Sequence, residues 1–355
     1  MPIFLGLGAM KIGIIGLPGS GKTTIFNALT GRGAELSRAG AWHRGTNLAV
    51  VQVPDARLSA LARLFNPSKI TPATVEFVDV AVEFSEDKAR DGRLEELIAA
   101  LRPAQALFHV VRAFDLAGLP PQPQADLDRL ESELVITDLI SVERRLERLE
   151  KDAKRGKRPP AREYELLLKA REMLEAGRPL RLDREISEAP ELKGFAFLTA
   201  KPVVVVLNLG DEAEAPSLKV EAAALVVIRG ALELEVSQLP SEEAEVFRKE
   251  YGLYESAVDH LIQAGYRVLD LISFFTAGEK EVRAWTIRAG TTAVKAAGAV
   301  HSDMERGFIR AEVIFWEDLV RLGSYQAARE EGLLRLEGRD YIVQDGDVVI
   351  FRFKV

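Results

Sequence analysis

A glycine-rich run near the start of the chain has the residue types and spacing of a phosphate-binding loop. Residues 16–23 read Gly-Leu-Pro-Gly-Ser-Gly-Lys-Thr and match the pattern G-x-x-x-x-G-K-[ST]. The preceding run 11–15 (KIGII) predicts a short buried strand, and 24–29 (TIFNAL) predicts the start of a helix. Backbone N–H groups of such a turn converge on an anion, and the helix dipole adds to the attraction. We therefore expect the chain to bind a nucleoside di- or triphosphate.

The residue types in and near this loop suggest separate roles in binding the phosphates and Mg²⁺. Lys22 is expected to reach the β- and γ-phosphates and to stabilise the transferring charge, while the Thr23 hydroxyl is expected to ligate Mg²⁺. Asp79 follows the apolar run 75–78, where the aspartate of a P-loop NTPase reaches Mg²⁺, usually through water. A carboxylate that caps a turn is the alternative for Asp79. The predicted nucleotide contacts of the loop are Pro18, Gly19, Ser20, Gly21, Lys22, Thr23 and Thr24.

Short apolar runs that alternate with helical segments provide the elements to position this loop. The runs cover residues 11–15, 48–53, 75–78, 106–111, 203–207 and 224–228. Strands alternating with helices predict an α/β fold with a mostly parallel sheet that helices cover on both faces. Pro120, Pro121 and Pro123 then mark a change in the character of the chain.

The segment from Asp126 to about Gly177 has a helical pattern that is interrupted around 156–160. Apolar residues recur at intervals of three and four, at Leu139, Val142, Leu146, Leu149 and Ala153. This pattern predicts two antiparallel helices that form a hairpin inserted into the nucleotide domain. From Glu143 to Arg162 there are nine Arg or Lys residues and four Asp or Glu residues. Such a run is either a solvated face or a contact for RNA phosphates.

The stretch from about Leu271 to Val355 forms a third predicted unit without a catalytic constellation. Strands are expected at 282–287, 341–343 and 348–353, and a helix near 316–322, as a small half-open sheet over a helix. His301 and Asp303 have the spacing of metal ligands, but such a lone pair is more often structural. The predicted domains are 10–119 with 198–270, the insertion 120–197, and 271–355.

Composition excludes several classes of function. Lys and Arg number 47 against 54 Asp and Glu, so the net charge of −7 argues against coating of nucleic acid, and no DNA partner is expected. The absence of cysteine excludes disulfides and thiolate metal sites. The sequence offers no apolar stretch of membrane-spanning length and no signal peptide, which favours a cytoplasmic location. Residues 1–9 are interpreted as an extension upstream of Met10.

Three groups of motifs resemble one known family. The runs GIIGLPGSGKTTIFNALTG, VVQVPDARLSALARLFNPSKITPATVEFVDVA and HVVRAFD are similar to the nucleotide domain of the YchF/Obg-like ATPases. ITDLISVERRLERLEKDAK is similar to the family's helical insertion, and FFTAGEKEVRAWTIRAGTTAVKAAGAVHSDMERGFIRAEV to its TGS domain. The resemblance covers nearly all of residues 10–355. It implies a G-domain-like P-loop NTPase with a coiled-coil hairpin and a C-terminal β-grasp (TGS) domain, ATP or GTP with Mg²⁺ as cofactors, and association with ribosomes.

The resemblance also implies roles for residues beyond the P-loop. His109, in the run His109-Val110-Val111-Arg112, could position water near the phosphates, or could be a histidine satisfied by hydrogen bonds at a strand end. The run Asn208-Leu209-Gly210-Asp211 stands where the family has N-x-x-E. There Asn208 would tie the loop to the P-loop, and Leu209 replaces the lysine whose stem packs on the base in guanine-reading loops. Leu209 and Asp211 are therefore expected among the nucleotide contacts.

The acid of this loop leaves the choice of base open. Asp211 restores the guanine-type acid, whereas the family prefers ATP. The backbone N–H of Gly230, in Arg229-Gly230-Ala231, is a further expected contact with the base.

Three departures from the family pattern cluster around the γ-phosphate and Mg²⁺. Val82 replaces a glycine that meets the γ-phosphate, His43 stands at the position of an Mg²⁺-binding threonine with Thr46 nearby, and Gly19 replaces a P-loop asparagine. Nucleotide binding is expected to survive these changes better than hydrolysis. The first hypothesis is therefore a slow NTPase associated with ribosomes or translation. The alternative is a scaffold without hydrolysis that binds RNA or protein through the hairpin and the TGS domain. A small-molecule kinase is a weaker third reading, against which the C-terminal motifs and the hairpin argue.

Overall fold

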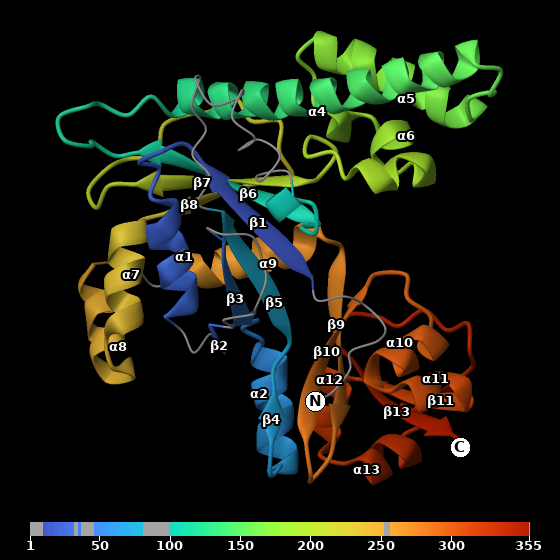
Figure 1. The fold of residues 1–355 in the computed structure, drawn as a ribbon. Coiled ribbons are helices and arrows are strands. Elements are labelled where there is room, and N and C mark those ends of the chain that lie inside the picture. Colours follow the sequence, from blue (N-terminus) through green and yellow to red (C-terminus); the bar gives the residue numbers. More distant parts are fainter. Residues whose placement is uncertain (1–9, 32–34, 37–45, 81–98, 252–255, 355) are drawn as a thin grey trace. The chain divides into compact units, whose positions relative to one another are not determined.

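A computed structural model of the chain describes residues 10–31, 35–36, 46–80, 99–251 and 256–354. These residues form two compact units (Figure 1). The larger unit comprises Lys11–Val50 and Glu76–Leu261, and the C-terminal unit combines Val51–Val75 with Ile262–Val355. No described helix has both the length and the apolar character that crossing a membrane requires.

A seven-stranded sheet forms the centre of the larger unit, with the strand order β2-β3-β5-β1-β6-β7-β8. The strands are β1 (Lys11–Gly16), β2 (Glu35–Leu36), β3 (Thr46–Gln52), β5 (Thr74–Val80), β6 (Ala106–Ala113), β7 (Val203–Leu209) and β8 (Ala224–Ile228). β1 pairs in parallel with β5 and β6, and β7 pairs in parallel with β6 and β8, whereas β2 and β3 are antiparallel. The expected α/β class with a mostly parallel sheet is thereby confirmed, and each of the six expected strands is present.

Apolar residues of the strands and helices make the core of this unit. The helix α1 (Lys22–Thr30) begins directly after the P-loop and buries Ile25, Phe26, Ala28 and Leu29. It packs against α7 (Gly230–Gln238), which α8 (Ser241–Glu250) and α9 (Ala257–Val268) follow in the chain. On another part of the sheet, β6 and β7 form one cluster with Leu127, Leu130 and Leu134 of the helix α4 (Pro123–Lys154).

The predicted helical hairpin is formed by α4 and α5 (Ala161–Glu175), which lie side by side (Figure 1). Val142, Leu146 and Leu149 are buried as the three-and-four spacing predicts, whereas Ala153 is exposed near the end of α4. Pro123 begins α4, and Gly156 takes a left-handed conformation with φ 85° in the connection to α5. The segments η2 (Leu180–Leu182), α6 (Arg184–Ser187) and η3 (Pro190–Phe195) complete the small core beside the two helices.

A buried carboxylate joins the hairpin to the chain segment that leads into β7. Asp138 of α4 accepts hydrogen bonds from Leu198 N at 3.0 Å, from Thr199 N at 2.7 Å and from the Thr199 hydroxyl at 2.7 Å. Burial raises the pKa of Asp138 to about 6, although these hydrogen bonds oppose the shift. The nearby Lys201 donates to the carbonyls of Arg102 and Ala104, and burial lowers its pKa to about 8.

The C-terminal unit contains a mixed six-stranded sheet with the order β12-β11-β13-β9-β10-β4. Its strands are β4 (Ile70–Thr71), β9 (Leu271–Ala277), β10 (Val282–Arg288), β11 (Phe308–Phe315), β12 (Arg335–Glu337) and β13 (Asp347–Phe353). Its helices are α2 (Ala56–Phe65), α10 (Ala293–Val300), α11 (Ser302–Arg306), α12 (Trp316–Leu322) and α13 (Tyr325–Glu330). The strand expected at 341–343 is wrong, because only Ile342 forms a bridge, with Thr292, in the connection between β12 and β13.

The segment 51–75 comes from the first third of the sequence and is built into this second sheet. β4 pairs in parallel with β10, and α2 packs against β9, β10 and α12. Arg57 of α2 forms ion pairs with Asp55 and with Asp345, 2.8 and 2.7 Å away, and lies over the ring of Phe275. Leu58 and Leu61 are buried in this interface within the C-terminal unit.

Candidate functional site

The P-loop lies between the end of β1 and the first residue of α1. Gly19 and Gly21 have φ values of 77° and 83°, in the left-handed region that favours glycine. The loop closes through a hydrogen bond from Ser20 N to Leu17 O of 3.1 Å. A Cβ atom on Gly16 would lie 2.6 Å from Ser20 Oγ and 2.7 Å from Val110 O, so this position admits only glycine. The loop therefore has the compact backbone that a phosphate-binding turn requires.

Lys22 and Asp79 are brought together at one edge of the sheet. β5 is the parallel neighbour of β1, with Ile14 opposite Asp79, so the carboxylate of Asp79 lies beside the P-loop. Lys22 Nζ is 2.8 Å from Asp79 Oδ1, and Asp79 is only 1% exposed. The second carboxylate oxygen accepts a 3.4 Å hydrogen bond from Asn47 Nδ2 at the start of β3.

Oxygen donors suited to Mg²⁺ occur in this part of the site. Mg²⁺ prefers hydroxyl, carboxylate and water oxygens, and the exposed Thr23 and the buried Asp79 belong to the elements that flank the P-loop. The buried Ser20 Oγ has no hydrogen-bond partner among the described residues. A buried polar atom without a partner is consistent with a site that a ligand completes. The donor set and the glycine cradle therefore fit a magnesium nucleotide.

Asn208 links the P-loop to the two loops that follow β7 and β8. Its Nδ2 donates to Ser20 O over 3.0 Å, and its Oδ1 accepts from Gly230 N over 3.0 Å. Asn208 is 4% exposed, and a Cβ on Gly21 would collide with its amide nitrogen. One buried amide side chain thus fixes Gly230, at the start of α7, against the P-loop.

Leu209 and Asp211, the other two residues of this loop that were expected to contact the base, lie in different environments. The Asp211 side chain is exposed, while its carbonyl accepts a 2.8 Å hydrogen bond from Arg229 Nε. Leu209 is 4% exposed and belongs to the apolar cluster beneath α4. Leu209 therefore packs in the core, and it is Asp211 that offers an open polar side chain.

Two aromatic or polar residues of the site were not identified from the sequence. Phe114 follows β6 directly, and its ring reaches within 3.8 Å of a Cβ position on Gly21. Its own Cβ is 3.4 Å from a Cβ position on Gly210, so Phe114 lies between the P-loop and the loop after β7. Asn47 contacts Asp79 as described above. Phe114 had a sequence signal, because it directly follows a strand and ligands of such sheets bind at the carboxyl ends of the strands, whereas no signal marked Asn47 at a strand start.

His109 lies in the middle of β6 and is 1% exposed. It shares a strand face with Leu107 and Val111, which pack beneath α4. Burial, and secondly the positive charge of Arg181, lowers the pKa of His109 to about 3. Its Nδ1 has no hydrogen-bond partner within the described part of the chain. The structure thus places His109 as a neutral, enclosed imidazole on the α4 side of the sheet.

Several further residues were considered in the sequence, and the structure describes only some of them. His43 and Val82 lie outside the described residues, and Thr46 begins β3. His301 caps α11 by accepting a hydrogen bond from Asp303 N through Nδ1. Across the described ranges there is no group of three or more His, Asp and Glu residues that could hold a metal ion.

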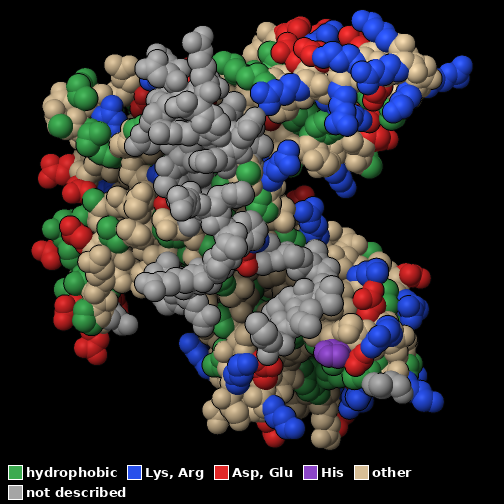
Figure 2. All heavy atoms as spheres, in the orientation of Figure 1, with side chains coloured by type: hydrophobic (Ala, Val, Ile, Leu, Met, Phe, Trp, Pro, Cys, Tyr) green, Lys and Arg blue, Asp and Glu red, His purple; other side chains and the backbone are tan. Residues whose placement is uncertain are grey.

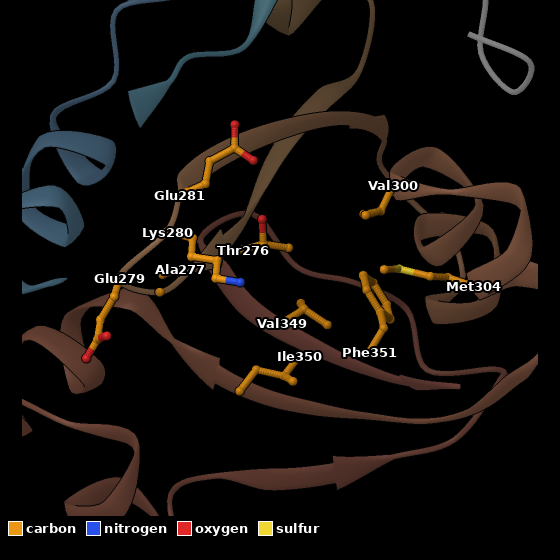
Figure 3. Close-up of a pocket in the computed structure, with 11 residues that line it drawn as sticks. Thr276, Ala277, Glu279, Lys280, Glu281, Val300, Met304, Val349, Ile350 and Phe351 are labelled. Carbon is orange, nitrogen blue, oxygen red and sulfur yellow. The ribbon is translucent and has the colours of Figure 1, made fainter. Parts of the chain in front are cut away.

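A pocket of about 560 Å³ lies in the C-terminal unit and contains none of the predicted nucleotide contacts (Figure 3). Val300, Met304, Val349 and Phe351 supply apolar walls. The Lys280 side chain points into the pocket, whereas Glu279 points away from it (Figure 3).

The fold and the site together define the class of protein. A mostly parallel sheet, a glycine-rich loop before α1, an acid at the end of the neighbouring strand and an asparagine loop after β7 are the parts of a P-loop NTPase. A family model described as "50S ribosome-binding GTPase" matches residues 11–149. A second model, YchF-GTPase_C, described as a protein of unknown function, matches residues 271–354.

Full-length relatives identify the family within this class. The chain is 41% identical to the ribosome-binding ATPase YchF of Haemophilus ducreyi, with 97% of this chain and 99% of the relative covered. It is 40% identical to the Bacillus subtilis protein of the same name, over 98% and 100% of the two chains. The solved structure of the Schizosaccharomyces pombe YchF GTPase matches with a TM-score of 0.79 and 28% identity, over 98% and 99% of the chains. The chain belongs to the YchF family.

Proposed function

We propose that this protein is a slow magnesium-dependent NTPase that hydrolyses ATP and works at the ribosome. The bacterial relatives are named ribosome-binding ATPases, and the fission-yeast structure is titled a GTPase. The observation that carries the proposal is the ion pair between Lys22 and Asp79. Its Nζ–Oδ1 distance of 2.8 Å brings the P-loop lysine to the aspartate at the end of β5. Nucleotide binding and hydrolysis together are the function that best accounts for this fold, this ion pair and these relatives.

The residues of the site have separate roles in this proposal. Lys22 exchanges Asp79 for the β- and γ-phosphates when nucleotide binds, and the P-loop amides hold the remaining phosphate oxygens. The released Asp79 and the Thr23 hydroxyl would hold Mg²⁺, which supplies neutralisation of the charge on the transferring phosphoryl group. Asn208 keeps the base-binding loops in register with the P-loop.

The base is expected to bind between the loops after β6, β7 and β8. Phe114 supports this placement because its ring approaches Gly21 of the P-loop while its Cβ lies beside Gly210 of the loop after β7. The backbone N–H of Gly230 is already used by Asn208, so the exposed Asp211 is the stronger candidate for a polar contact with the base. We infer a preference for ATP from the names of the bacterial relatives. GTP would be preferred instead if the contact of Asp211 with a guanine base determined the affinity.

A second candidate function is a nucleotide-dependent scaffold that does not hydrolyse its ligand. The burial of His109 supports this alternative, because an imidazole that is 1% exposed beneath α4 is poorly placed to orient water. Gly19 also removes a polar side chain from the loop. Binding at the P-loop is common to both candidates, so they differ only in turnover.

Calorimetric titration of nucleotide-free protein with Mg-ATP, Mg-ADP, Mg-GTP and Mg-GDP, followed by overnight assays of phosphate release, tests the proposal. Release from ATP that Lys22→Ala abolishes is the expected result. Lys249→Ala is the matched control, because Lys249 is an exposed lysine paired with Glu245 on α8. Tight nucleotide binding without phosphate release would support the scaffold instead of the enzyme. Selective binding of GTP would overturn the preference for ATP. If no nucleotide bound, the proposed function itself would be overturned.

The ribosome contact is proposed to involve the helical hairpin, supported by the C-terminal unit. Figure 2 shows Lys and Arg side chains gathered over the hairpin formed by α4 and α5. Lys154, Arg155, Lys157 and Arg158 at its tip are exposed and have no ion pair among the described residues. By contrast, Arg145 and Arg162 pair with glutamates. Free cations at one tip suit the phosphates of ribosomal RNA, and a ribosome-bound role implies a cytoplasmic location.

A further inference from the structure

A tight hairpin follows β6 and reaches the P-loop. Leu116 and Leu119 exchange two backbone hydrogen bonds of 3.1 and 3.0 Å. The two residues between them, Ala117 and Gly118, have φ values of 51° and 81°, as in a two-residue turn with both central residues in the left-handed region. Asp115 Oδ1 accepts a 2.8 Å hydrogen bond from Gly118 N. An alanine in this region is strained, and such strain persists where the surrounding structure holds the turn in place.

Arg112, near the end of β6, holds this turn. Its Nη1 donates to Phe114 O at 3.0 Å and to Leu119 O at 2.9 Å, and its Nη2 donates to Pro120 O at 3.2 Å. These three acceptors are all backbone carbonyls of the segment that contains the turn. The planar guanidinium can satisfy several acceptors at fixed angles, which a lysine ammonium cannot do as rigidly.

The turn places one leucine directly against the phosphate-binding loop. A Cβ on Gly19 would lie 2.7 Å from Leu116 Cδ2, so the leucine occupies the space that a side chain at position 19 would need. Phe114, at the base of the same segment, approaches Gly21 of the same loop. Leu116 remains 40% exposed, which leaves an apolar surface beside the P-loop available for a ligand.

We propose that the Leu116–Leu119 hairpin is a fixed apolar wall of the nucleotide site, in which Leu116 contacts the bound nucleotide and Arg112 is the positioning residue. This inference rests on the proposed nucleotide binding. Leu116 closes the side of the P-loop at Gly19 against water, and the phosphate contacts of the loop amides and Lys22 strengthen in the drier site. Position 19 must then be glycine for two reasons: Leu116 fills the space of a side chain there, and the backbone has a positive φ.

The test compares Leu116→Ala with Leu119→Ala by calorimetric titration with Mg-ADP and Mg-ATP. Both leucines belong to the same turn, but Leu119 is 63% exposed and makes no contact with the P-loop glycines. We expect Leu116→Ala to weaken binding about fivefold, as loss of a partly buried leucine contact implies, and Leu119→Ala to leave it within twofold. Leu116→Asn, which keeps the branched shape of the side chain but makes its end polar, is expected to weaken binding in the same way. Circular dichroism and the thermal midpoint check that each variant is folded.

A double-mutant cycle separates positioning by Arg112 from a structural role. Arg112→Lys is expected to weaken binding in the wild-type background but to have little further effect in Leu116→Ala, because both changes remove the same contact. Equal affinities of wild type, Leu116→Ala and Leu119→Ala would overturn this inference alone. Additive effects of Arg112→Lys and Leu116→Ala would overturn the role of Arg112. Failure of the wild type to bind any nucleotide would overturn the proposed function and the wall together.

Discussion

At the scale of single residues, the ion pair between Lys22 and Asp79 gives the binding site its electrostatic character. Both side chains are largely buried, with 14% and 2% of their surfaces exposed. Removing one partner of such a pair leaves a buried charge without compensation, which is costly. Under the proposed function, nucleotide and Mg²⁺ would bring one negative and one positive partner to the same place. Ligand binding at this site would then be an exchange of ion partners.

The buried His109 makes the stability of the larger unit sensitive to acid. Its pKa is lowered to about 3 in the folded protein, while an unfolded chain has the ordinary value near 6.5. The unfolded state therefore binds the proton first, so the stabilisation is fully present above pH 6.5 and is lost as the pH falls toward 3. We expect this residue to contribute a loss of at most about 1.4 kcal/mol per pH unit in that window.

Urea unfolding between pH 7 and pH 4 measures this contribution. His109→Leu introduces an apolar side chain like those of its neighbours Leu107 and Val111. It should make the free energy of unfolding less dependent on pH. His301→Gln is the control, because His301 is an exposed side chain of the C-terminal unit and should leave the slope as in wild type. Identical slopes for wild type and His109→Leu would show that His109 is not held neutral in the folded protein.

The sequence predicted the association of Lys22 with Asp79 better than it predicted the residues around them, and their binding of phosphate and Mg²⁺ stays a prediction. Lys22 and Thr23 belong to a motif whose spacing is local, whereas Asp79 was expected from its place after an apolar strand. The parallel pairing of β1 with β5 brings Asp79 to Lys22. The contacts of Asn47 and Phe114 depend on loops from distant segments, which spacing does not reveal. Leu209 was expected beside the base, but its apolar side chain is more stable in the core beneath α4.

At the scale of elements, the attachment of the helical hairpin depends on Asp138 rather than on apolar packing alone. Asp138→Ala removes the acceptor for two buried backbone N–H groups and one hydroxyl. We expect the free energy of unfolding to fall by about 2–4 kcal/mol, because unsatisfied buried donors retain their desolvation cost. Hydrogen exchange at Leu198 and Thr199 should accelerate, and urea unfolding gives the magnitude.

A second aspartate on the same helix provides the control for this prediction. Asp128 is exposed on α4 and accepts a hydrogen bond from Gln124 four residues earlier. Asp128→Ala should change the free energy of unfolding by less than about 0.5 kcal/mol. If the two alanine variants were equally stable, Asp138 would have no role in holding the hairpin.

Elements with regular apolar periodicity were predicted well, and short elements were not. The strand 224–228 and the helix 316–322 have the predicted bounds, and α4 and α5 follow the expected hairpin. The run 341–343 contains Tyr341 and Val343, which favour strands, yet Tyr341 instead donates a hydrogen bond to Asp347 in a connection. β4 has two residues and exists only because β10 provides a partner.

At the scale of the whole molecule, ribosome binding is expected to depend on the four cations at the hairpin tip. Replacing Lys154, Arg155, Lys157 and Arg158 by glutamate should weaken co-sedimentation with ribosomes. The slope of log affinity against log salt concentration should fall by about three, since each phosphate contact releases counterions. Nucleotide affinity should be unchanged, because the tip is separate in sequence and in packing from the P-loop.

Replacing four cations of the C-terminal unit by glutamate is the control, because it changes the net charge of the protein by the same amount. Lys295, Arg306, Arg321 and Lys354 are exposed cations of that unit. Their replacement by glutamate should reduce binding less than the reversals at the hairpin tip. A larger loss from the C-terminal set would make that unit, and not the hairpin, the principal contact.

The division into units was only partly accessible from the sequence, because the chain order does not show which segments pack together. The change of pattern near Pro120 and the third predicted unit were visible. The grouping of 51–75 with 262–355 was not, since α2 and β4 have no distinguishing composition and depend on β9, β10 and α12 for their burial.

The path of residues 51–75 has a consequence for the evolution of this family. The strands that carry Asn47 and Asp79 are joined through α2 and β4, which belong to the other unit. Swapping the C-terminal unit for an unrelated module would uncover Leu58 and Leu61 and disturb the covalent link between those two strands. We therefore expect the two units to be inherited together, and we expect a substitution that loosens α2 to affect the positions of Asn47 and Asp79 as well as stability.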